Sequence, residues 1–112
     1  MIFPNFQCVV SGDAFSPSRV AACSDFAISN AVDASGTGKG GRATISVDPT
    51  ASLERLVDCL EKHAVSFRLL GGTDIEIFAD IRYESQANWE LAPEMLARIG
   101  RLNAHLLMSF YE

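Results

Sequence analysis

The sequence has few of the residues that mark metal sites and redox chemistry. Its 112 residues include three cysteines and two histidines, and no CxxC pair occurs. Three cysteines are too few, and odd in number, for a disulfide framework. Cys8, Cys23 and Cys59 are therefore predicted to be buried free thiols. A zinc site needs three or four convergent ligands, and His63 and His105 stand at no familiar spacing from the cysteines, so the sequence predicts no metal ligand.

Long apolar runs and clusters of positive charge are also missing. No stretch approaches the roughly 20 apolar residues of a membrane span. The opening residues, MIFPNFQCVV, lack the basic region and cleavage site of a signal peptide, so we expect a cytoplasmic location. Nine Lys and Arg against 14 Asp and Glu give a net charge of −5. Because binding to phosphates needs clustered Lys and Arg, nucleic acids and membrane surfaces are not expected partners.

The common catalytic signatures are absent as well. No GxSxG motif occurs, and the glycine-rich segment Asp33–Arg42, DASGTGKGGR, matches neither GxxxxGK[ST] nor GxGxxG. The simplest interpretation of this segment is a loop that joins two strands. The alternative is a phosphate-binding loop or lid, which would make the protein a small-molecule sensor or an enzyme of ferredoxin-like type. We predict no catalytic residue and no cofactor.

One strongly alternating stretch, Gly71–Glu84, is the clearest feature that the sequence does contain. Successive side chains of a strand point to opposite faces, so this stretch predicts a long strand with a core face and an outer face. The core face holds Ile75, Ile77, Ala79, Ile81 and Tyr83. The outer face holds Asp74, Glu76, Phe78, Asp80, Arg82 and Glu84.

The remaining patterns predict a single α+β domain over residues 1–112. Gly71 and Gly72 suit a two-residue hairpin turn before the alternating strand. The expected order is β-α-β-β-α-β-β-α-β, a ferredoxin-like arrangement with a mostly antiparallel sheet and its helices on one face. The other expected strands are residues 6–11, 26–29, 42–47, 65–70 and 104–111, and the expected helices are residues 17–23, 50–64 and 93–102. The second helix is expected to bury an apolar stripe, and His63 stands near its end, where the helix dipole favours a cation. The last strand is expected to point Leu106, Met108 and Phe110 into the core and His105 outward.

Two stretches resemble a known family. They are residues 12–20, GDAFSPSRV, and residues 91–102, LAPEMLARIGRL, the latter followed by a strand that ends in Phe110-Tyr111. They are similar to the opening motif, final helix and final strand of a bacterial family catalogued as domain of unknown function 4279. Members often have a tryptophan after the glycine-bearing loop, where this chain has Ala43-Thr44-Ile45; its tryptophan is Trp89. The family has no established activity, so the resemblance implies a small bacterial protein, with immunity-type binding as an analogy.

These observations favour a non-enzymatic protein-interaction module. A row of carboxylates on a strand is usually a solvated outer face that resists edge pairing. Apolar residues among those charges can instead form a binding patch for a protein partner or for a second copy in a homodimer. The candidate partner-binding residues are Asp74, Glu76, Phe78, Asp80, Arg82, Leu107 and Tyr111.

Overall fold

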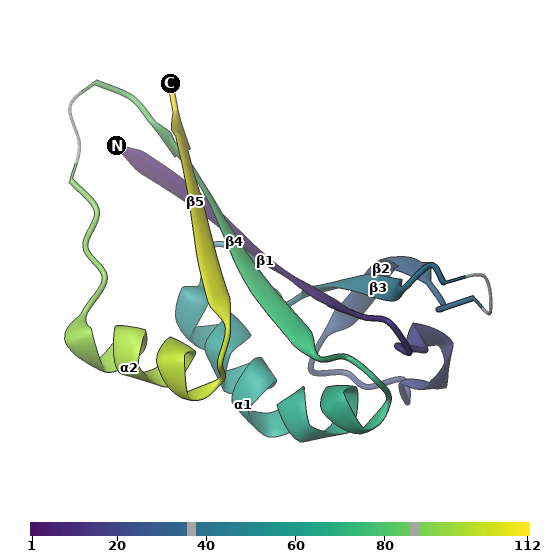
Figure 1. Cartoon of the computed structure of the whole chain (residues 1–112). Helices are drawn as coiled ribbons and strands as arrows, with labels where there is room; N and C mark the ends of the chain where they lie inside the picture. The colour runs from purple at the N-terminus through teal and green to yellow at the C-terminus, as the bar shows by residue number, and fades with distance from the viewer. Residues whose placement is uncertain (36–37, 86–87) are drawn as a thin grey trace.

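Five strands form one mixed sheet, which makes one layer of the molecule (Figure 1). The computed structural model describes residues 1–35, 38–85 and 88–112. The strand order is β2-β3-β1-β4-β5; β4 and β5 are parallel, and the other neighbouring pairs are antiparallel. The strands are β1 (Ile2–Gly12), β2 (Ala27–Val32), β3 (Gly41–Ser46), β4 (Asp74–Tyr83) and β5 (His105–Tyr111). The helices are α1 (Leu53–Leu69), α2 (Pro93–Arg101) and the 3-10 turn η1 (Pro17–Arg19).

Both α-helices lie on the same side of the sheet in Figure 1, which leaves the opposite face open. The alternation of β4 explains this arrangement. Ile75, Ile77 and Ala79 are fully buried, whereas Asp74 and Arg82 on the other side of the strand are exposed. The predicted α+β class and the two faces of β4 are therefore confirmed. α1 supplies the second half of the core with a matching apolar stripe: Leu53, Leu56, Val57, Cys59, Leu60, Ala64 and Phe67 are buried.

α1 is longer than expected, and the predicted strand at residues 65–70 is its last part. That prediction was wrong. Val65, Phe67 and Leu69 alternate with other residues, which is the pattern of a strand. In the structure Phe67 continues the buried helical stripe, whereas Val65 is 66% exposed and Leu69 is 81% exposed. The exposed apolar residues Val65 and Leu69, with the buried Phe67 between them, gave the helix the alternating pattern that is typical of a strand.

Gly71 and Gly72 end α1 and do not close a hairpin, so the predicted turn was also wrong. The N–H of Gly72 donates to the carbonyl of Phe67 at 2.8 Å, and the N–H of Gly71 donates to that of Arg68 at 3.0 Å. These two bonds form a Schellman motif, in which the left-handed residue is usually glycine. Gly71 fits this position because its φ is +97°.

The predicted helix at residues 17–23 is only the single turn η1. The chain is already extended at Val20, with φ −71° and ψ 125°. The carboxylate of Asp33 accepts hydrogen bonds from the N–H and the hydroxyl of Ser18, at 3.0 and 2.5 Å. Phe26 then packs edge-to-face on Phe67 of α1. These contacts hold the segment as a loop. The described residues contain two α-helices, not three, and the ferredoxin-like order is not confirmed.

Arg98 of α2 joins the two α-helices by contacting Asp58 and Glu61 of α1. Its Nη2 lies 2.5 Å from Asp58 Oδ1 and 2.6 Å from Glu61 Oε1. The hydrogen bond from Arg98 holds the pKa of Glu61 below its usual value. We expect Arg98→Met to lower the free energy of unfolding by about 0.5–1 kcal/mol at neutral pH.

This effect should depend on pH. A carboxyl group with a lowered pKa stabilises the folded state above its unfolded pKa, and the contribution is lost as the pH falls through the folded value. The difference between the wild type and Arg98→Met should therefore shrink below about pH 4. Urea unfolding at neutral and acid pH measures it. Arg101→Met is the control, because it removes the same charge from α2 but none of the hydrogen bonds of Arg98. An equal loss of unfolding free energy in both variants would contradict a stabilising role of the Arg98 contacts.

Candidate functional site

The seven predicted partner-binding residues all lie in two adjoining strands, β4 and β5, on the open face. Phe78 of β4 lies opposite Leu107 of β5, and Arg82 lies opposite Tyr111. Paired residues on one face of a sheet have Cβ atoms about 5 Å apart, so these side chains are neighbours. The structure thus brings together six of the seven predicted residues. Asp74 stands apart, because it pairs with Ser11 of β1 before β5 begins.

This face carries an aromatic and apolar patch within its polar surroundings. Leu107 is 40% exposed and Tyr111 is 49% exposed. Phe78 of β4, which has a strand on either side, is half-buried. Phe3 of β1, which sequence reasoning did not select, adds a third large exposed side chain at 37%. The guanidinium carbon of Arg82 lies 4.6 Å from the centre of the Phe3 ring, a cation–π geometry. The patch therefore extends across three strands.

The acidic residues of β4 are spaced along its outer face. Glu76 and Asp80 are four residues apart on one face, a separation of about 13 Å along the strand. Two carboxylates that act on one bond are usually less than about 10 Å apart. Asp74 and Glu76, two residues apart, lie about 7 Å from each other along the strand and fall within that range. His105 is exposed and pairs with Glu76 at the start of β5, on the outer face as predicted.

β5 is an edge strand with large apolar residues exposed on both of its faces. The sequence predicted that Met108 and Phe110 point into the core. They lie on the helix side, but Met108 is 47% exposed and Phe110 is 52% exposed, so the predicted burial was wrong. α2 and the chain before it cover this side only in part: Leu106 packs against the core, and the Trp89 ring lies 6.5 Å from that of Phe110.

A second group of chemically active side chains lies at the other end of the covered face. His63 Nε2 is 2.8 Å from Asp25 Oδ2 and 4.0 Å from Cys23 Sγ. The sequence placed His63 near a helix end, where the helix dipole would explain it. Because α1 continues to Leu69, His63 is an interior residue of the helix, and Asp25 is its partner.

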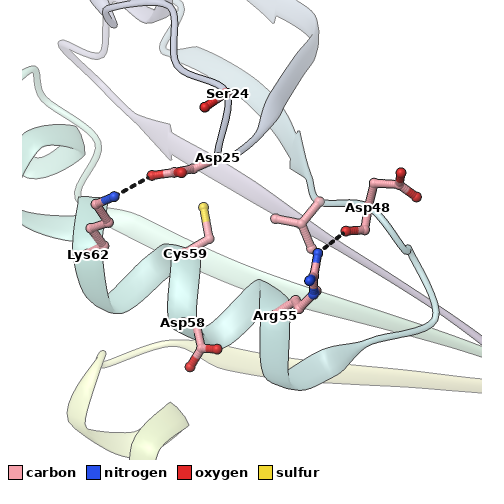
Figure 2. Close-up of a pocket in the computed structure, with 8 residues that line it drawn as sticks. Ser24, Asp25, Asp48, Arg55, Asp58, Cys59 and Lys62 are labelled. Carbon is pink, nitrogen blue, oxygen red and sulfur yellow. Dashed lines mark hydrogen bonds and ion pairs between the residues drawn. The ribbon is translucent and has the colours of Figure 1, made fainter.

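The loop that holds Cys23 and Asp25 borders two cavities. Figure 2 shows the larger one, of about 420 Å³, with Asp25, Cys59 and Lys62 around it. Lys62 Nζ lies 2.8 Å from Asp25 Oδ2, and this ion pair, with His63, holds the pKa of Asp25 well below its usual value. Burial, followed by the charge of Asp25, raises the pKa of the Cys59 thiol to about 11. A thiol with a raised pKa is a poor nucleophile at neutral pH, because little of it is present as thiolate.

The glycine-rich loop has a structural explanation for two of its glycines. A Cβ on Gly41 would lie 2.0 Å from the carbonyl oxygen of Phe15, and one on Gly40 would lie 2.9 Å from that of Gly12. The backbone of this loop therefore packs directly against the chain that follows β1. Residues 36–37 lie outside the described part of the chain. The small-molecule role of Asp33–Arg42 stays a prediction.

Comparison with protein-family models, with curated proteins and with solved structures found no match. The resemblance to domain of unknown function 4279 accordingly stays a prediction. Among the described helices, none combines the length and the apolar character needed to cross a membrane.

Proposed function

We propose that this chain is a non-enzymatic protein-interaction module of the bacterial cytoplasm. Its binding surface is the open face of β4 and β5 together with the free edge of β5. The observation that supports this proposal best is the exposure of β5: four of its large apolar side chains, Leu107, Met108, Phe110 and Tyr111, are each at least 40% exposed. Contiguous apolar surface of this kind marks interaction sites in folded proteins.

The backbone of β5 supports the same conclusion. β5 pairs with β4 on one side, and in the described part of the chain no strand pairs with its other side. An edge strand leaves alternate N–H and C=O groups available to an added strand. Natural edges are usually protected by lysine, proline or inward-pointing charge, and the segment HLLMSFY contains none of these. An extended apolar peptide segment is the partner that this edge fits.

A second copy of the chain fits the same edge. In an antiparallel pair centred on Met108, Leu106 would lie opposite Phe110 of the other copy, and Leu107 opposite Ser109. No like charges face each other in this register, because residues 106–111 carry no charged side chain. Homodimerisation through β5 is therefore one form of the proposed interaction, and its two-fold symmetry is that of most soluble dimers.

The test compares three proteins: the wild type, Leu107→Ser/Tyr111→Ser, and Leu69→Ser. Leu69 is an apolar residue that is 81% exposed on α1, so its variant is a matched control for lost exposed hydrophobicity. Light scattering at several concentrations measures self-association, and affinity purification from the native cell extract measures partners. We expect the wild type and Leu69→Ser to share a dimer or a partner that the double variant loses by more than about tenfold in affinity.

Equal stability of the three proteins in thermal unfolding shows that the double variant remains folded. The proposal is wrong if the folded double variant keeps every partner and the same oligomeric state as the wild type. It is also wrong if Leu69→Ser causes the same loss, because the binding surface would then include α1.

A further inference from the structure

Three metal-ligand side chains converge between the loop before β2 and the middle of α1. The ligand atoms of Cys23, Asp25 and His63 all lie within 4.8 Å of one another. Cys23 and Asp25 stand two residues apart in the loop, and His63 lies on α1. Cys23 and His63 are half-buried, and the Asp25 side chain is 33% exposed, so the atoms meet at the edge of the surface.

Aromatic packing fixes the orientation of the histidine. The Phe26 ring packs edge-to-face on the His63 imidazole at 4.9 Å and also on the Phe67 ring at 5.6 Å. The His63 and Phe67 rings lie 6.3 Å apart. This aromatic cluster surrounds the ring and leaves Nε2 directed at Cys23 and Asp25. The imidazole is thus held in place before any ligand binds, which lowers the entropic cost of binding.

The arrangement differs from that of a catalytic triad. In such a triad the histidine uses one ring nitrogen for the nucleophile and the other for the acid that orients it. Here the Cys23 sulfur and the Asp25 carboxylate both face Nε2 of His63. Three ligand atoms that face one another at this range can coordinate a single metal ion.

The distances are close to those of a tetrahedral zinc ion. Zinc bonds of about 2.3 Å to sulfur and about 2.0–2.1 Å to nitrogen and oxygen place N and O about 3.3 Å apart and S and N about 3.6 Å apart. The observed separations are 2.8 Å between His63 Nε2 and Asp25 Oδ2, and 4.0 Å between Cys23 Sγ and His63 Nε2. Zinc binding would therefore require the nitrogen and oxygen to move apart by about 0.5 Å and the sulfur and nitrogen to approach by about 0.4 Å.

We propose that Cys23, Asp25 and His63 bind one Zn²⁺ ion, with the fourth position open to water or a small ligand. A thiolate, an imidazole and a carboxylate suit zinc, whereas Mg²⁺ and Ca²⁺ prefer oxygen ligands alone. Cys23 and His63 also line a cavity of about 250 Å³ beside the cluster, and Asp25 lines the cavity in Figure 2. The open position is therefore accessible from solvent.

Lys62 contacts the same carboxylate as the proposed metal ion. Its side chain is 67% exposed, and its Nζ lies 2.8 Å from Asp25 Oδ2, the oxygen that also faces His63. Zinc must displace this ion pair, and the lysine side chain can turn into solvent. The competing explanation is that these ion pairs only anchor the loop to α1. The two explanations differ in the effect that removing Lys62 has on zinc affinity.

The experiment titrates chelator-treated protein with ZnCl₂ by calorimetry and with CoCl₂ by absorption spectroscopy. We expect one metal ion per chain and, with Co²⁺, a sulfur-to-metal charge-transfer band. His63→Ala should weaken binding by more than about tenfold. His105→Ala removes the other histidine of the chain, on β5, and should bind as the wild type does. Lys62→Ala should bind zinc more tightly, because the competing ammonium is gone.

Cys23→Ser keeps the size of the side chain and provides the test if His63→Ala fails to fold. It should lose the charge-transfer band while its circular dichroism stays that of the wild type. Absence of stoichiometric metal binding in the wild type would overturn the proposal. Wild-type affinity in both Cys23→Ser and His63→Ala would overturn it equally, since the metal would then lie elsewhere.

Discussion

Phe67→Ala should lower the free energy of unfolding by about 3–5 kcal/mol, which is the usual cost of truncating a buried phenylalanine. Phe67 is fully buried, and it packs on Phe26 from the loop before β2. The substitution removes the last large side chain of the α1 stripe and leaves a cavity beneath that loop. Chemical denaturation followed by circular dichroism gives the change directly.

The matched controls are Val65→Ala and Leu69→Ala, two residues on either side of Phe67. Both are exposed on α1, so each should change the free energy of unfolding by no more than about 0.5 kcal/mol. In the strand predicted from the sequence, residues 65, 67 and 69 would share one face and their truncations would have similar costs. Similar losses in all three variants would therefore contradict the helix.

Gly71→Ala is expected to destabilise the protein by at least about 2 kcal/mol, since a side chain at a positive φ is strained and here also collides with the backbone. Gly71 has φ +97°, and a Cβ on it would lie 2.4 Å from the carbonyl oxygen of Ala14. The chain after β1 would have to move away from the end of α1. Thermal and urea unfolding measure the loss.

Gly100 is the control for this prediction. It lies within α2, and a Cβ on it would meet no atom within 4 Å. Gly100→Ala should stabilise the protein by about 0.5–1 kcal/mol, because alanine loses less backbone entropy than glycine in a helix. Opposite signs for the two variants are the expected result. A neutral Gly71→Ala would show that the close approach of residues 14 and 71 is not formed.

The candidate sites were predictable to different extents. The sequence identified the outer face of β4 and the matching side of β5, because alternation gives the direction of each side chain along a strand. It did not identify the exposure of Met108 and Phe110, which depends on how much of β5 the α2 region covers. It also missed Cys23, Asp25 and His63. The one available signal was the Cys-x-Asp pair, which by itself is too common to indicate a site.

The sequence by itself determined the two faces of β4, the buried stripe in the first part of α1, and the α+β class. These features follow from local periodicity, which reports side-chain direction within one segment. Only the tertiary structure decided that residues 65–70 continue a helix, that β5 lies at an edge, and that Cys23 meets His63 across 40 positions of the chain. The physical reason is that such pairings depend on packing between distant segments, and burial in that packing outweighs local propensity.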